Sequence, residues 1–251
     1  MSQEKDTGIV LSKKSSGEAD DICSIFTRNS GKDRFIFKGL KKSTKRPRTA
    51  SEPGSILDIL YYTGKAGGFS TISGFDILAT HNSIRKSSEK IFSLYFILEL
   101  VDLTTGPADP NPKIFNLLSA GIETLSGTLF PKHFAVFFTI KYLLLQGVFP
   151  DTEKCSWCGI SDPDKLVVEN NGLRVSCIGC TDFKSAVIRS RGTEFINKCV
   201  KLKLDKIECG NYPEKDIIQV LTTLIEYINS YYSIKLKSGS MLTRTVIEKM
   251  V

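Results

Sequence analysis

The stretch that decides the fold is Cys155-Ser-Trp-Cys158-Gly, followed about eighteen residues later by Cys177-Ile-Gly-Cys180. Two residues between thiols let one tight turn aim both sulfurs at a single ion. Two such turns supply the four corners of a tetrahedron, with a Zn–S distance of about 2.3 Å. The pattern therefore predicts a structural Zn²⁺ site with Cys155, Cys158, Cys177 and Cys180 as ligands. A site with four protein ligands has no open position for a substrate, so it is a scaffold whose metal stabilises the fold.

The spacer between the two C-x-x-C turns, called knuckles below, predicts a β-hairpin. Lys165–Glu169 and Leu173–Cys177 are short runs of strand-forming residues, separated by Asn170-Asn171-Gly172. An Asn-Gly pair supplies the positive φ angles that a tight hairpin turn needs. The hairpin would return the second knuckle to the first, which predicts a zinc ribbon over residues 151–182.

Other uses of the four cysteines stay open at this point. Disulfides persist in oxidising compartments, and nothing in the sequence suggests export. A redox pair would have one C-x-x-C near a βαβ pattern, and an iron–sulfur cluster also takes four thiolates, although the hairpin favours zinc. Cys23, Cys199 and Cys209 are isolated and are expected to be small buried hydrophobes.

The composition favours a nucleic-acid partner. The chain has 251 residues, 41% of them hydrophobic, with a formal net charge of +7, which suits nucleic acid or, less often, anionic lipid. The polar N-terminus has no signal-peptide core. The most apolar run, Phe134–Val148, falls short of the ~20 residues that cross a bilayer. We therefore expect a cytoplasmic protein that does not span a membrane.

The spacing of hydrophobic residues changes from a strand-like to a helix-like pattern near residue 79. Before it, short alternating runs with Gly-rich turns predict a small antiparallel β-barrel. The predicted strands are residues 7–12, 21–27, 34–38, 55–62 and one that begins at Phe69. The predicted helices run from Ile84 to about Thr104 with a cap at Asn82-Ser83, from Pro112, from Pro131 to Gly147, over residues 192–200, from Pro213, and from about Met241. The predicted domains are a barrel at 1–79 and a helical domain at 80–251 that carries the ribbon.

A basic loop lies between two predicted strands. The candidate nucleic-acid contacts are Lys32, Arg34, Lys38, Lys41, Lys42, Lys45, Arg46 and Arg48. Positive loops over a small barrel attract a phosphate backbone, although charge runs are more often solvated loops. The aromatic residues Phe35, Phe37, Tyr61, Tyr62 and Phe69 could stack bases, although aromatics at strand spacing are more often core.

The sequence does not match the enzyme motifs that its residues could suggest. Gly64-Lys65 is not a phosphate-binding loop, because Ile59 stands where its first Gly is needed and Ala66 replaces the Ser or Thr. The imidazole bases available are His81, expected in a loop, and His133, expected to cap or pack a helix. We therefore predict that the protein is not an enzyme.

Several motifs, taken in order, resemble the bacterial recombination mediator family RecO over nearly the whole chain. These are Gly17-Glu-Ala-Asp20, Ser24-Ile-Phe-Thr27, Phe37–Lys42, Asp109–Asn116, Leu143–Gly147 with Pro150 and Cys155–Gly159, and Lys235–Ser238. The resemblance implies an α+β multidomain protein, with an N-terminal OB-fold followed by the helical domain and its four-cysteine zinc ribbon.

The resemblance also implies a function. RecO-like proteins bind single- and double-stranded DNA and anneal complementary strands without nucleotide hydrolysis. They act with RecR, and usually RecF, to load RecA onto DNA coated by single-strand-binding protein, and they dock the tail of that protein on the helical domain. A basic rim near Lys235 and Lys237 is the expected tail site, and the expected location is nucleoid-associated.

Two other functions fit parts of the sequence. A zinc-ribbon OB-fold protein that binds RNA would have the same charge and elements. An NAD-dependent deacylase also has a four-cysteine structural zinc, but it needs a Gly-rich dinucleotide fold before the ribbon, where this chain has a strand-turn pattern.

Overall fold

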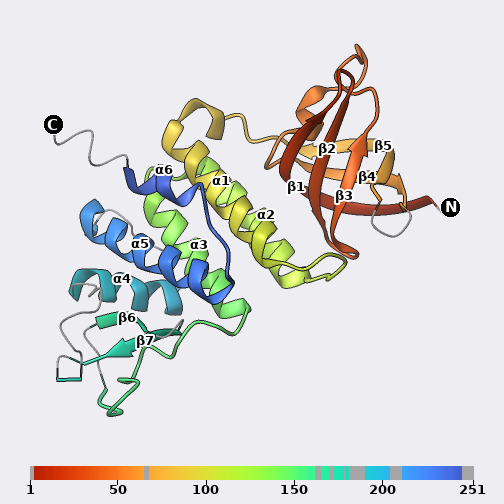
Figure 1. Cartoon of the computed structure of the whole chain (residues 1–251). Coiled ribbons are helices and arrows are strands. Elements are labelled where there is room, and N and C mark those ends of the chain that lie inside the picture. The colour runs from red at the N-terminus through yellow and green to blue at the C-terminus, as the bar shows by residue number, and fades with distance from the viewer. Residues whose placement is uncertain are drawn as a thin grey trace. The chain divides into compact units, whose positions relative to one another are not determined.

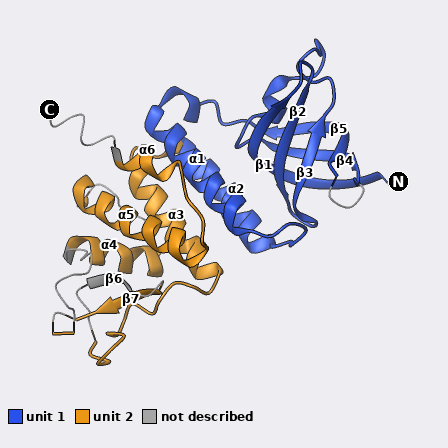
Figure 2. Cartoon of the chain, viewed as in Figure 1, with its two compact units in different colours: residues 1–126 blue, residues 127–251 orange. Residues whose placement is uncertain are grey.

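The structure is a computed structural model that describes residues 3–64, 68–161, 165–169, 172–177, 179–180, 190–203 and 211–244. The chain forms two compact units, Met1–Ser126 and Gly127–Val251 (Figure 2). The last strand of the first unit ends at Ala79. Whether the chain folds as domains divided there stays a prediction.

The first unit contains a closed five-stranded barrel (Figure 1). Its strands are β1 (Gln3–Ser16), β2 (Asp20–Thr27), β3 (Gly31–Phe37), β4 (Ile56–Tyr62) and β5 (Ser70–Ala79). The order is β1-β2-β3-β5-β4, and all neighbours are antiparallel except β3 and β5, which are parallel. This barrel followed by helices confirms the predicted fold class.

The strand β1 is longer than the predicted residues 7–12. Its N-terminal half pairs with β4, and its C-terminal half pairs with β2. A register shift between Val10 and Ser12 bends the strand where it changes partner, which is how a small barrel closes. The extensions were missed because their side chains are mostly exposed and polar, so they lack the apolar alternation of a half-buried strand.

The barrel core is apolar. It contains Val10, Cys23, Ile25, Phe35, Phe37, Leu40, Ala50, Leu57, Ile59, Tyr61 and Ile72. The rings of Phe35 and Tyr61 meet edge to face, with centroids 5.1 Å apart. Of the two roles left open for Phe35, Phe37 and Tyr61, the structure supports core packing and not base stacking, because the strand alternation turns these three rings into the core.

The first helix begins later than predicted. A 3₁₀ turn, η2 (Ile84–Lys86), precedes α1 (Ser88–Thr104). The cap is Ser87, whose extended backbone lets its hydroxyl accept the Lys90 N–H at 3.4 Å. The predicted cap at Asn82-Ser83 is wrong, because Ser83 has helical backbone angles and its side chain makes no capping bond.

Helix α1 is bonded to the outer face of the barrel through Asp102. The Ser12 and Ser24 hydroxyls donate to its carboxylate at 2.9 and 2.7 Å, and the Lys32 ammonium lies 3.7 Å from it. The loop after α1 also contacts the barrel, because the Ala108 N–H donates to the Lys32 carbonyl at 2.9 Å. Helix α2 (Pro112–Gly127) follows and, as predicted, buries Ile114, Leu118, Ile122 and Leu125 on one face.

The second unit is helical. Its elements are α3 (Pro131–Leu145), the hairpin β6 (Lys165–Glu169) and β7 (Gly172–Ser176), α4 (Ser190–Lys201), α5 (Glu214–Tyr231) and α6 (Gly239–Arg244). Helix α3 packs against α4 and α5, and it is buried on most of its surface, as its apolar sequence predicts (Figure 1). Among the described residues, no helix combines the length and hydrophobicity of a bilayer span.

Candidate metal centre and nucleic-acid interface

The structure brings the four predicted metal ligands together. The sulfur atoms of Cys155, Cys158, Cys177 and Cys180 all lie within 4.8 Å of one another. Those of Cys158 and Cys177 are 3.6 Å apart. A disulfide needs about 2.05 Å, whereas tetrahedral bonds of about 2.3 Å to one zinc ion place the sulfurs about 3.8 Å apart. The four thiols therefore fit a single metal ion.

Backbone hydrogen bonds shape the knuckles. The Cys155 N–H donates to the Ile160 carbonyl at 2.9 Å, and the Gly159 N–H donates to the Cys155 carbonyl at 3.0 Å. Gly159 has a φ of +74°, which its lack of a Cβ permits. The Ser156 N–H donates to the Val175 carbonyl on β7 at 2.8 Å, so the hairpin holds the first knuckle.

The hairpin forms with a small shift from the prediction. Glu169 pairs with Gly172, so the second strand is Gly172–Ser176 and not 173–177. Asn170 and Asn171, part of the predicted turn, lie outside the described residues, as does much of the C-terminal end of the predicted ribbon at 151–182. The isolated Cys23 and Cys199 are buried as expected, and Cys209 lies outside the described residues.

Backbone dipoles favour the thiolate at Cys155. Burial opposes its ionisation, but N–H groups of Cys158, Cys177 and Trp157 outweigh burial and lower the pKa of this thiol to about 6. Hydrogen bonds to the charged form of a group lower its pKa. Because the thiolate is the form that binds metal, this knuckle is prepared for a cation.

The basic loop at residues 38–48 is held against the turn between β1 and β2. The Gly39 N–H donates to the Asp20 carboxylate at 2.7 Å, and the Lys41 N–H donates to the Ala19 carbonyl at 3.0 Å. The Lys41 ammonium donates to the Gly17 carbonyl at 3.0 Å and lies 3.6 Å from the buried Asp21 carboxylate. Lys41 therefore anchors the loop.

The predicted cations divide into two groups. Lys32 and Lys41 are half-buried, whereas the others are exposed: Arg34, Lys38, Lys42, Lys45, Arg46 and Arg48. Lys42 lies 3.1 Å from Glu18, but both side chains are mostly exposed, so solvent weakens the pair. Arg46 donates to the Lys38 carbonyl at 2.6 Å, and Arg48 donates to the Lys41 carbonyl, so the two arginines also brace the loop.

Two of the predicted stacking aromatics are accessible. Tyr62 is 38% exposed and Phe69 is 39% exposed. The Arg34 guanidinium lies over the Phe69 ring, 5.0 Å from its centroid.

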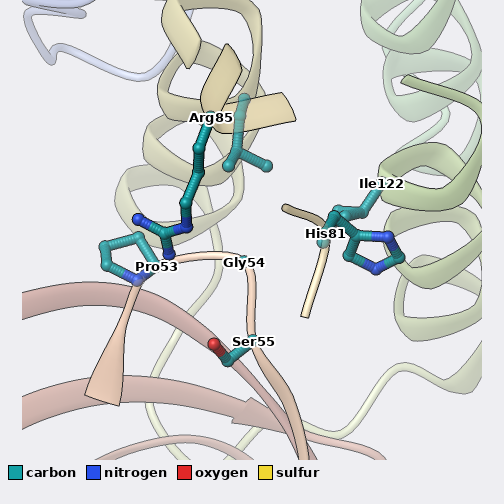
Figure 3. Close-up of a pocket in the computed structure, with 7 residues that line it drawn as sticks. Pro53, Gly54, Ser55, His81, Arg85 and Ile122 are labelled. Carbon is teal, nitrogen blue, oxygen red and sulfur yellow. The ribbon is translucent and has the colours of Figure 1, made fainter. Parts of the chain in front are cut away.

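His133 is buried and His81 is half-buried. Figure 3 shows the imidazole of His81 beside Ile122 at a small cavity of about 10 Å³, which has room for about one water molecule. Its Nδ1 lies 3.5 Å from the Glu123 carboxylate, and burial lowers its pKa while Glu123 opposes the shift. His133 donates from Nε2 to the Tyr212 carbonyl at 3.0 Å, which agrees with the predicted packing role.

Sequence comparisons cover both units. A sequence model of the family described as "Recombination protein O N terminal" matches residues 1–81, and one described as "Recombination protein O C terminal" matches residues 85–240. The chain belongs to the RecO family. The resemblance predicted from the motifs is therefore confirmed. The two RecO matches meet just after β5 ends at Ala79 and before α1 begins at Ser88.

Relatives named DNA repair protein RecO match most of the chain. The protein from Exiguobacterium sp. is 25% identical over 251 residues, which cover 99% of this chain and 96% of the relative. The protein from Desulforamulus reducens is 26% identical over 242 residues, covering 94% and 92%. The protein from Geobacter metallireducens is 30% identical over 164 residues, covering 65% and 66%.

Proposed function

We propose that this RecO-family chain is a DNA repair and recombination mediator without catalytic activity. It binds single- and double-stranded DNA and anneals complementary strands without ATP. The observation that carries this proposal is the braced loop at residues 38–48, which presents exposed cations on a barrel. Family membership and the relatives' name support a role in DNA repair.

The proposed mechanism is neutralisation of phosphate charge. Two single strands repel each other through their phosphates, and a polycation bound to both lowers that repulsion and raises their local concentration. Base pairing then supplies the free energy of annealing. The loop is held by bonds to Asp20, Ala19 and Gly17, so its exposed lysines lose little additional backbone entropy on binding.

The four-cysteine cluster would hold a structural Zn²⁺ ion. With four thiolates the ion has no position for a substrate, so it would supply folding energy to the hairpin and knuckles. The thiolates would come from Cys155 and Cys158 on one knuckle and Cys177 and Cys180 on the other.

The proposed partners are RecR and the tail of single-strand-binding protein, with RecF and RecA acting in the same process. The proposed cellular location is the cytoplasm, in association with the nucleoid. Lys235 and Lys237 are both exposed, on either side of the buried Leu236. An exposed pair of cations near the end of α5 supports the proposed rim for an acidic tail.

Strand annealing tests the proposal. Complementary oligonucleotides would be annealed without nucleotide, with and without single-strand-binding protein, and matched RNA strands would be run beside them. The test variant changes the exposed Lys38, Lys42 and Lys45 together to Gln. The matched control changes Lys5, Lys86 and Lys113 to Gln, which removes the same charge from exposed sites elsewhere in the first unit.

We expect the wild type and the control to accelerate DNA annealing and the loop variant to lose at least tenfold in rate at about 0.1 M salt. Equal rates for loop variant and control would overturn the role of the loop. Acceleration of RNA but not DNA annealing would favour the RNA-binding alternative.

A further inference from the structure

An open groove of about 410 Å³ lies on the outer face of the barrel. It is lined by Ser12–Ser16 on β1, Ile22 and Ser24 on β2, Arg34 on β3, and Phe69. The strand register places the residues of its floor side by side: Ser12 pairs with Ser24, Ser24 with Arg34, and Lys14 with Ile22. Residues that alternate with the buried Cys23 and Ile25 therefore face outward into the groove.

Among the described residues that line the groove, every charged side chain is a cation. Lys13 is paired with Glu52, whereas Lys14 is exposed. Arg34 is exposed, and its guanidinium lies over one face of the Phe69 ring. A carboxylate lies near one end, because Ser12 and Ser24 donate to Asp102, but Lys32 lies 3.7 Å from it. The groove therefore suits an anionic ligand that contacts Lys14 and Arg34.

The groove also suits a flat ligand. Phe69 exposes 39% of its surface, and its cation–π contact with Arg34 holds a guanidinium plane beside the ring. Exposed aromatic rings and guanidinium planes stack nucleobases, and they do so with little dependence on base identity. The volume lies within the range of about 300–1,000 Å³ for small-ligand sites. An unpaired nucleotide joins the flat base and the phosphate that these side chains would bind.

A duplex cannot use this contact in the same way, because its bases are stacked on one another and their faces are covered. We infer that the groove is a single-strand subsite in which Phe69 stacks one unpaired base and Lys14 and Arg34 hold its backbone. Phe69 is then the residue that distinguishes single strands from duplex, while the loop at 38–48 contacts the backbone of either. This inference rests on the proposed DNA-binding function.

The test compares two nucleic acids of one length. Fluorescence anisotropy would measure the affinity of a labelled thymidine oligonucleotide and of a labelled duplex at fixed salt. Phe69→Ala is expected to weaken single-strand binding by about 5- to 150-fold, which corresponds to ~1–3 kcal/mol per stacked base. Duplex affinity should stay within about twofold. The control Tyr95→Ala removes a similarly exposed aromatic, 42% exposed, which lies on α1 outside the groove, and it should change neither affinity.

A second variant separates stacking from folding. Phe69→Trp keeps a stacking ring, so it should retain single-strand affinity, and its emission should be quenched by the thymidine oligonucleotide but not by duplex. Equal losses for single strand and duplex in Phe69→Ala, or no loss in either, would overturn the inference. The inference would also be overturned if an acidic, apolar peptide displaced the single strand from the wild type but not from Phe69→Ala. A wild type that binds neither nucleic acid would instead overturn the proposed function.

Discussion

The ionisation of Cys155 depends on local backbone geometry. The N–H groups that lower its pKa belong to the same knuckle and to the facing one, at Cys158, Trp157 and Cys177. The C-x-x-C spacing places two of these donors, and the hairpin places the third. A metal ion bound there would join two chain segments that are separated by the hairpin, which is why its loss should destabilise the second unit.

Changing Cys155 to Ser should remove the metal. A hydroxyl does not replace a thiolate as a zinc ligand, so we expect the wild type to carry about one zinc per chain and the variant less than half. Metal analysis of the purified proteins and thermal unfolding measure the two effects. Cys23→Ala is the control, because Cys23 is buried in the barrel core and its loss should leave the metal content unchanged. A wild type with less than half an equivalent of metal contradicts the assignment.

His133 should make stability depend on pH. Burial lowers its pKa in the folded chain, although the Tyr212 carbonyl and Glu214 oppose the shift. The unfolded histidine takes up its proton near pH 6.5, above the folded pKa, so the unfolded state binds more protons in the window between them. The free energy of unfolding should therefore fall as pH decreases from about 7 through that window.

The His133→Gln variant isolates this effect. Its amide N–H can still reach the Tyr212 carbonyl, but it does not titrate. Urea unfolding at a series of pH values should give a shallower loss of stability in acid for the variant than for the wild type. Because the pKa of His81 is also lowered, some dependence should remain. Identical pH profiles would show that His133 does not contribute.

At the scale of elements, Asp102 on α1 links helix and barrel. It accepts from Ser12 on β1 and Ser24 on β2 and lies beside Lys32 on β3, so one carboxylate contacts three neighbouring strands. The outer face of the barrel that continues from these serines forms the groove with Arg34. Helix α1 thereby fixes the strands that position the proposed subsite.

Replacing Asp102 by Ala should destabilise the first unit by about 1–3 kcal/mol, because two hydroxyls lose their acceptor and Lys32 loses its carboxylate while remaining half-buried. Chemical unfolding measures the change. Asp76→Ala, which removes an exposed carboxylate on β5, should stay within about 0.5 kcal/mol of the wild type. A similar small effect for both variants would mean that the Asp102 carboxylate does not hold α1 to the barrel.

At the scale of the whole molecule, charge governs the proposed DNA binding. The formal net charge of +7 attracts any polyanion, but the number of phosphate contacts depends on which cations reach the surface. In fluorescence anisotropy titrations at several salt concentrations, log affinity for single-stranded DNA should fall linearly with log salt concentration. The triple variant at Lys38, Lys42 and Lys45 should reduce that slope by about 2, at about 0.7 per lost contact. An unchanged slope would place the phosphate contacts elsewhere.

In the first unit, the local sequence pattern misplaced the end of one strand and the start of one helix. The strand β1 runs to Ser16, but the prediction ended it at Ser12, so Lys13 and Lys14 were not recognised as part of the barrel face. The N-terminal cap of α1 was placed four residues early because Ser83 and Ser87 are both suitable caps by residue type. Only the backbone angles, extended at Ser87 and helical at Ser83, distinguish them.

The sequence by itself determined the barrel-then-helix order, the four cysteines of the candidate metal site and the excess of positive charge. The order of elements and the cysteine pairs depend on patterns that span a few residues. The charge depends on composition alone. Tertiary structure decided which cations and which aromatics are exposed. Lys41 became an anchor because Asp21 and the Gly17 carbonyl lie beside it, and Phe35 entered the core while Phe69 stayed accessible. Those outcomes depend on strand register and on contacts between distant segments, which no short stretch of sequence contains.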